Sequence, residues 1–181
     1  ESKYGAEIPL TTIGITMKVN QVVSAVLLGL ATGAQPIFGY NYGSGQKDRA
    51  KQAYRIILTA STIMLILAFF VFQFAPMSIV RLFGSESELY NEFAVKCFRI
   101  FLLACPINGL QMATGVFFQS IGRPTQATIL SLSRQVVYLL PATILLPMAL
   151  GVEGALWAGP LADVLAFITT LVMLKLYWKK I

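Results

Sequence analysis

The chain has 181 residues, of which 56% are hydrophobic and 12% are charged, and its mean hydropathy is +0.71. Soluble domains carry roughly 25% charged residues, so this composition excludes an ordinary soluble domain and indicates a membrane protein. The net charge of +6 does not indicate nucleic-acid binding, because the basic residues fall in short clusters between apolar runs, as they do in cytosolic loops of membrane proteins.

Five apolar stretches are long enough to cross a bilayer, which takes about 20 residues as a helix. In chain order we expect helices at 10–38, 50–75, 90–121, 125–148 and 152–177. The connections between them, at 39–49, 76–89, 122–124 and 149–151, are short, so successive helices should be antiparallel neighbours. The apolar runs do not alternate with polar residues as membrane strands do. The predicted fold of residues 1–181 is therefore all-α, a polytopic membrane helical bundle.

Basic residues gather on one side of this arrangement. They are Lys47, Arg49, Lys51, Arg55, Arg123, Lys175, Lys179 and Lys180. The positive-inside rule makes this side, and the C-terminus with it, cytosolic. The chain begins on a polar loop without a methionine or a signal-peptide pattern, so we expect it to be part of something longer. One further helix would complete a six-helix half, a common plan among transporters.

Prolines punctuate three of the predicted helices. Pro106, Pro141 and Pro160 are the candidate bend points. Two interpretations stay open: ordinary kinks of membrane helices, or bends that shape a cavity or act as hinges.

Three ionisable residues lie at membrane depth, where such groups are usually paired and functional: Lys18, Arg134 and Asp163. With a rise of 1.5 Å per residue, Arg134 lies about 21 Å and Asp163 about 16 Å below the outer ends of two helices joined by a short turn. We therefore predict that they pair. The pair could lock the two helices together or act as a charge relay that changes partner during transport.

Neutral polar residues also occur at depth, and Asn108 and Gln111 share one helix face because they are three residues apart. Such a stripe either lines a cavity or bonds helices together. The candidate cavity or gate residues are Gln35, Asn108, Gln111, Arg134, Gln135, Tyr138 and Asp163. Gly29 and Gly33 form a G-x-x-x-G pair that predicts close helix packing.

Several kinds of chemistry are not indicated. The glycines of residues 33–50 fail the phosphate-loop spacing, because Gln46 separates Gly45 from Lys47. The chain has no histidine and no pair of acids at depth, so we expect no enzyme, no metal site and no resident cofactor. Cys97 and Cys105 lie in apolar sequence and are predicted to be buried free thiols.

Three segments resemble one family. "GLATGAQPIFGYNYGSGQKDRA" (29–50), "CPINGLQMATGVFFQSIGRP" (105–124) and "SLSRQVVYLLPATILLPMALGVEGALWAGPLADVLA" (131–166) resemble, in the same order, the C-terminal lobe of multidrug and toxic compound extrusion (MATE) transporters. The resemblance implies that the five helices are the eighth to twelfth of twelve, in one of two six-helix lobes around a central cavity. It also implies a bacterial inner-membrane exporter of organic, often cationic, compounds, driven by a proton or sodium gradient. Its partners would be these substrates, the lipid bilayer and an N-terminal lobe.

One position departs from the family pattern. Several members carry an acid two positions before "LQ" in the tenth helix, where this chain has Asn108. A neutral amide cannot take up a proton, so coupling could run through Asp163 or through an aspartate of the other lobe. The alternatives to an exporter are a lipid-linked saccharide flippase of the same superfamily and a non-transporting membrane scaffold.

Overall fold

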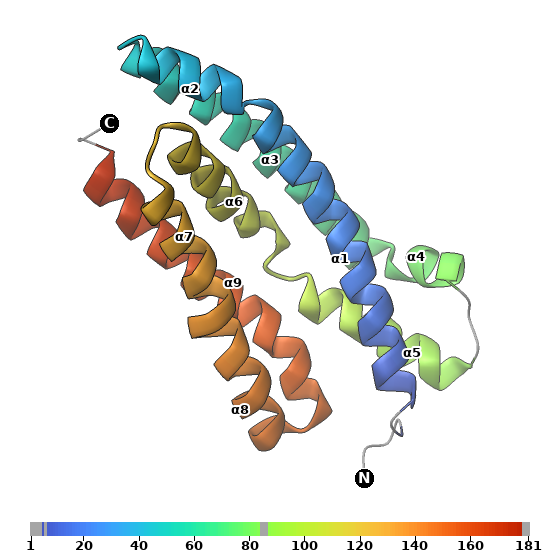
Figure 1. Cartoon of the computed structure of the whole chain (residues 1–181). Coiled ribbons are helices and arrows are strands. Elements are labelled where there is room, and N and C mark those ends of the chain that lie inside the picture. Colours follow the sequence, from blue (N-terminus) through green and yellow to red (C-terminus); the bar gives the residue numbers. More distant parts are fainter. Residues whose placement is uncertain (1–4, 6, 84–86, 179–181) are drawn as a thin grey trace.

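The computed structural model describes residues 5, 7–83 and 87–178, which fold as a helical bundle (Figure 1). Helix α6 (Cys105–Ser120) occupies the middle of the bundle, where it contacts α1 (Glu7–Gly33), α2 (Gln35–Gly43), α3 (Lys47–Phe74), α7 (Pro124–Leu132) and α9 (Val152–Tyr177). In Figure 1, α1 and α3 run along one side of α6, and the chain from α7 to α9 runs along the other.

Within the described residues, four helices are long and apolar enough to cross a membrane, and a fifth span forms if the bent pair α5 (Glu88–Phe101) and α6 counts as one. The structure thus supports the all-α membrane bundle predicted from the composition. The boundaries of the predicted helices differ in four places, and each difference has a local cause.

The first predicted helix, 10–38, is longer and is interrupted. Helix α1 ends at Gly33, and α2 begins at Gln35 with Pro36 in its first turn. A proline suits this place, because backbone N–H groups in the first turn of a helix have no bonding partner within the helix. Helix α2 then continues to Gly43, so the predicted connection 39–49 shrinks to a tight turn. Gly45 makes that turn at a φ of 79°, which a residue with a side chain rarely adopts.

The predicted connection 76–89 contains a short helix, α4 (Pro76–Phe83). Pro76 stands at its first position, where a proline suits a helix start, and Arg81 lies in its last turn. An eight-residue helix is too short to cross a membrane, so a search for spans could not find it. The predicted helix 50–75 corresponds to α3, which starts earlier with Asp48 in its first turn.

The predicted helix 90–121 is two helices, α5 and α6, bent by 46° across residues 102–104. Pro106 lies in the first turn of α6, just after this bend. The predicted helix 125–148 contains a π-helical segment, η1 (Ser133–Leu139), between α7 and α8 (Leu140–Leu150). It ends two residues before Pro141, which lies in the first turn of α8 and has no N–H to bond back into the preceding turn.

The last predicted helix, 152–177, corresponds to α9, which continues through Pro160 without a break. Helix boundaries therefore fall near Pro106 and Pro141, but not at Pro160. A role as a hinge stays a prediction at all three prolines.

The basic clusters of α3, the α6–α7 turn and the C-terminal end meet at one end of the bundle (Figure 1). The Lys51 ammonium lies 5.5 Å and the Arg55 guanidinium 5.8 Å from the centre of the Trp178 ring. Arg123 lies 5.5 Å from the ring of Tyr177. The sequence analysis put these basic segments on one side of the membrane from their charge alone, and the ring contacts show that they meet in the fold. Lys179 and Lys180 lie outside the described residues.

Close backbone approach occurs at other glycines than the predicted pair. Gly29 and Gly33 are exposed, and a Cβ built on either meets no atom of the described chain within 4 Å, so no described helix packs closely there and the expected packing stays a prediction. Gly109 of α6 instead faces α3, where a Cβ would lie 2.9 Å from the Leu65 side chain. Cys97 and Cys105 are buried free thiols, as predicted.

Candidate functional site

The predicted pair of deep charges is present in the middle of the bundle. Arg134 of η1 donates from Nε to Asp163 Oδ1 on α9 at 2.8 Å, and its Nη2 lies 2.7 Å from the same oxygen. Asp163 is only 6% exposed, whereas the Arg134 side chain is 26% exposed. A carboxylate so deeply buried needs its partner, because removing one member of a buried pair typically costs about 3–5 kcal/mol.

A third residue, Asn108, completes this cluster. Its Nδ2 donates to the second oxygen of Asp163, Oδ2, at 2.9 Å. Both carboxylate oxygens thus have donors from separate helices, α6 and η1. Asn108 stands one turn after the bend between α5 and α6, and Arg134 stands in the π-helical segment, so both interruptions contribute to placing the cluster.

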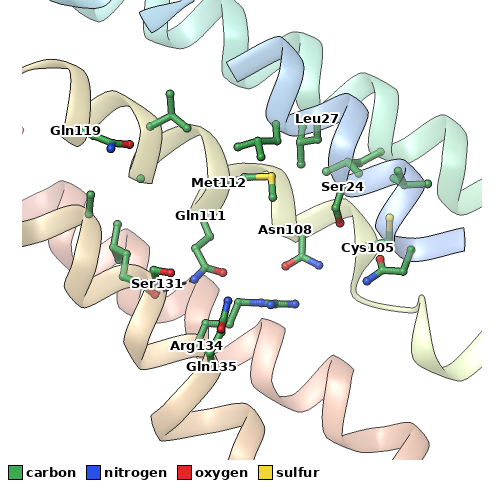
Figure 2. Close-up of a pocket in the computed structure, with 18 residues that line it drawn as sticks. Ser24, Leu27, Cys105, Asn108, Gln111, Met112, Gln119, Ser131, Arg134 and Gln135 are labelled. Carbon is green, nitrogen blue, oxygen red and sulfur yellow. Dashed lines mark hydrogen bonds between the residues drawn. The ribbon is translucent and has the colours of Figure 1, made fainter. Parts of the chain in front are cut away.

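A cavity of about 300 Å³ opens between α1, α6 and the α7–η1 segment (Figure 2). We call it the large cavity. Its polar lining residues are Asn20, Ser24, Asn108, Gln111, Gln119, Ser131, Arg134 and Gln135. Apolar side chains, among them Leu27, Leu65 and Met112, complete its wall.

A second cavity of about 180 Å³, the small cavity, lies beside the Asp163 carboxylate. It is lined by Met17, Asn20, Gln21, Phe101, Leu102, Cys105, Asn108, Arg134, Leu139, Gly159 and Asp163. Four residues, Asn20, Cys105, Asn108 and Arg134, line both cavities.

The two cavities follow one another along the bundle. On α1 the small cavity reaches Met17 while the large cavity extends to Leu28, toward the basic end. On the α7–η1 segment the order is the same, since Leu139 lines the small cavity and Ala127 the large one. The cluster of Asn108, Arg134 and Asp163 therefore stands at the boundary between them.

Five of the seven predicted site residues border these cavities: Asn108, Gln111, Arg134 and Gln135 the large one, and Asp163 the small one. Gln35 and Tyr138 line neither; Gln35 opens α2, and the Tyr138 hydroxyl shares a 2.7 Å hydrogen bond with Thr169 of α9. The pathway role assigned to all seven stays a prediction.

The sequence-based selection left out several lining residues, including Asn20, Ser24 and Ser131. Asn20 and Ser24 are four residues apart and so share one face of α1, a spacing that could have revealed them. No cluster of three or more His, Cys, Asp or Glu side chains suited to a metal ion occurs in the described ranges 7–83 and 87–178.

Membrane-length helices around a polar interior, with an ion pair beside two cavities, define a polytopic helical membrane protein. The chain belongs to the MatE family, whose model matches residues 2–144. It is 23% identical over 168 residues to the multidrug export protein MepA of Staphylococcus haemolyticus, and 25% identical over 158 residues to an FAD transporter of Shewanella oneidensis.

The fold also matches a solved structure of the MATE multidrug transporter DinF-BH, with a TM-score of 0.82 and 35% identity. That match covers 90% of this chain but 36% of the DinF-BH chain. The two curated relatives are matched over 92% and 86% of this chain, and over 36% and 34% of their own lengths. The chain thus spans about a third of its relatives and corresponds to one lobe of a MATE transporter.

Proposed function

We propose that this chain is the C-terminal lobe of a cation-coupled exporter of small organic molecules in a bacterial cytoplasmic membrane. Its curated relatives are named as a multidrug export protein and as an FAD transporter, and DinF-BH is named as a multidrug transporter. They lend no support to a saccharide flippase or to an inert scaffold. The shared basic end supports a cytosolic position for the α2–α3 turn and the C-terminus.

The observation that carries the proposal is the Asp163 carboxylate, buried at the boundary of the two cavities and bonded to Arg134 and Asn108. Asn108 is neutral, so among the described residues Asp163 is the buried carboxylate available for coupling. In the paired state, Arg134 occupies the place that a proton or a sodium ion would take on the Asp163 carboxylate.

Coupling then works by exchange of partners. A cation that reaches Asp163 through the small cavity neutralises the carboxylate and releases the guanidinium of Arg134 toward the large cavity, which it already borders. Loss of the cation restores the pair. In the paired state the Asp163 carboxylate links α9 to Arg134 of η1, and with a bound cation this link is lost. The exchange of partners can therefore bias the packing of the lobe.

Export by the transporter that contains this chain, purified into proteoliposomes, tests this function. An imposed proton or sodium gradient should drive uptake of a fluorescent drug against its concentration, and dissipating that gradient should stop it. A protein that accumulates no drug under either gradient, although it is folded and correctly inserted, would refute the proposed export activity.

A further inference from the structure

Two cations of α3 share one aromatic ring at the basic end of the bundle. Lys51 and Arg55 are four residues apart and so lie on one face of α3. Their charged groups lie 5.5 Å and 5.8 Å from the centre of the ring of Trp178, the residue that follows α9. Each cation is attracted to the ring, but the shared ring also holds two like charges near each other, and they repel. An anion bound between them would remove that repulsion.

The Trp178 ring is itself held in place by buried neighbours. Its centre lies 5.6 Å from the ring centre of Tyr54 on α3 and 6.4 Å from that of Phe117 on α6. Tyr54 is buried, and its hydroxyl shares a 2.8 Å hydrogen bond with Thr114 of α6. Contacts from α3, α6 and the end of α9 therefore fix the position of the ring, and the ring orients the two cations. Such preorganisation lowers the entropy cost of binding a ligand.

The length of α3 places the two cations at the surface of the bilayer. From Arg55 to Phe74, the last residue of α3, the helix rises about 28 Å at 1.5 Å per residue. The hydrocarbon core is about 30 Å thick, so Arg55 lies at one of its boundaries when Phe74 lies at the other. Lys51 is one turn further out, about 6 Å beyond the core, in the layer of the lipid headgroups.

The face of α3 next to Arg55 is apolar and exposed. Ile56, Ile63, Leu67 and Phe70 are each more than half exposed, and their spacing of seven, four and three residues puts them on one side of the helix. This stripe crosses the hydrocarbon core and ends at the two cations and the tryptophan ring. A phospholipid has the matching form, with acyl chains that lie along an apolar stripe and a phosphate at its end.

The surrounding charge favours a lipid with a net negative charge. The α2–α3 turn, the α6–α7 turn and the end of α9 meet at this end of the bundle (Figure 1). They add the basic residues Lys47, Arg49, Arg123 and Lys175 to the two cations beside Trp178. Asp48, at the start of α3, offsets one of these charges. Basic residues close to a membrane surface attract anionic lipids in this way.

We propose that Lys51, Arg55 and Trp178 form a binding site for one anionic phospholipid in the leaflet at the basic end. The lipid phosphate lies between the two cations, and its acyl chains lie along the exposed stripe of α3. Arg55 can donate two parallel N–H bonds to phosphate oxygens, whereas Lys51 contributes a compact charge. The inference goes beyond the proposed export function, because it requires only that the protein is inserted in a membrane.

Native mass spectrometry of the purified transporter that contains this chain, titrated in detergent with a lipid, measures the affinity of that lipid. Dioleoyl phosphatidylglycerol and dioleoyl phosphatidylcholine have the same chains and a phosphate each, but only the first has a net charge. Arg55→Gln removes the charge and the fork of donors, and Arg55→Lys keeps the charge. Arg81→Gln makes the same change in the last turn of α4, beyond the other end of α3, and is the control. Glycerophosphoglycerol, the headgroup without acyl chains, is the competitor.

The wild type should bind phosphatidylglycerol about fivefold or more tightly than phosphatidylcholine. Arg55→Gln should weaken phosphatidylglycerol binding about fivefold, as expected for one basic residue at an anionic surface, and Lys51→Gln/Arg55→Gln should weaken it roughly 25-fold. Arg55→Lys should stay within about twofold of the wild type, and Arg81→Gln should change nothing. Binding of phosphatidylcholine should be equal in all these proteins, which shows that the variants are folded. Glycerophosphoglycerol should not displace the lipid.

Equal affinity of the wild type for the two lipids would overturn the inference. So would equal losses of phosphatidylglycerol binding in Arg55→Gln and Arg81→Gln, because they would show attraction to the net charge rather than to this site. Displacement by glycerophosphoglycerol would overturn the choice of a lipid and identify a soluble phosphodiester as the ligand. Phosphatidylglycerol binding without gradient-driven drug transport would leave the inference standing and count against the proposed function alone.

Discussion

Replacing Arg134 with methionine should destabilise the protein more than replacing Asp163 with asparagine. Arg134→Met keeps an apolar stem of similar length but removes both contacts to Asp163 Oδ1. The carboxylate, 6% exposed, then keeps the single donor of Asn108. Leaving a buried charge without its partner in this way costs about 3–5 kcal/mol.

Asp163→Asn removes the charge of the more buried member of the ion pair. The Arg134 side chain that remains is 26% exposed and borders both cavities, where water can solvate it. The loss of unfolding free energy in Asp163→Asn should therefore be smaller, about 1–3 kcal/mol, as for a polar group that loses one good partner. The double variant Arg134→Met/Asp163→Asn leaves no unpaired charge and should be more stable than Arg134→Met alone.

Unfolding of the purified transporter in detergent, followed by tryptophan fluorescence over a series of denaturant concentrations, measures these differences in free energy. The four proteins form a double-mutant cycle. Two results would refute the assignment of Asp163 as a buried charge dependent on Arg134. One is a smaller loss of unfolding free energy in Arg134→Met than in Asp163→Asn, and the other is a loss in the double variant equal to the sum of the two single losses.

Three further predictions concern the packing and the cavities. Gly109→Val should lower the free energy of unfolding by about 1–3 kcal/mol, because its Cβ would lie 2.9 Å from a leucine of α3. Gly29→Ala, at an open position, is the control and should not lower the free energy of unfolding. The same denaturant series compares the two variants. Trp178→Ala removes a half-buried ring that packs against Tyr54 of α3 and Phe117 of α6. It should cost about half of the roughly 3–5 kcal/mol typical of fully buried aromatic truncations, and an unchanged unfolding midpoint would contradict these ring contacts. A small methanethiosulfonate reagent should modify Cys105 faster than Cys97, because Cys105 lines both cavities and Cys97 lines neither. Mass spectrometry of timed samples measures the two rates. Equal rates would argue against open cavities.

The features that follow from distance along a helix could be predicted from the sequence. Apolar length gave the membrane spans, and the fixed rise per residue placed Arg134 and Asp163 at similar depths, where they do pair. Spacing along α6 likewise placed Asn108 and Gln111 on one face, and both line the large cavity.

Features that depend on rotation about the helix axis could not be predicted. The 46° bend before α6 and the π-helical segment before Pro141 both change which way the following side chains point. The bond from Asn108 to Asp163 was therefore not predicted, although the sequence placed Asn108 in a polar stripe and marked it as the loss of an acid. Gly29 and Gly33 show the converse, since a small-residue motif does not say which surface, if any, covers it.

The most direct test of the central claim, that Asp163 is the coupling carboxylate, compares two kinds of transport in proteoliposomes containing Asp163→Asn. Uptake driven by an ion gradient requires the coupling group, whereas exchange of labelled for unlabelled drug at equal concentrations does not. If Asp163 has this role, Asp163→Asn abolishes gradient-driven uptake and retains exchange at a rate comparable to the wild type. Gradient-driven uptake that is unchanged in Asp163→Asn would contradict this role and place the coupling group elsewhere in the transporter.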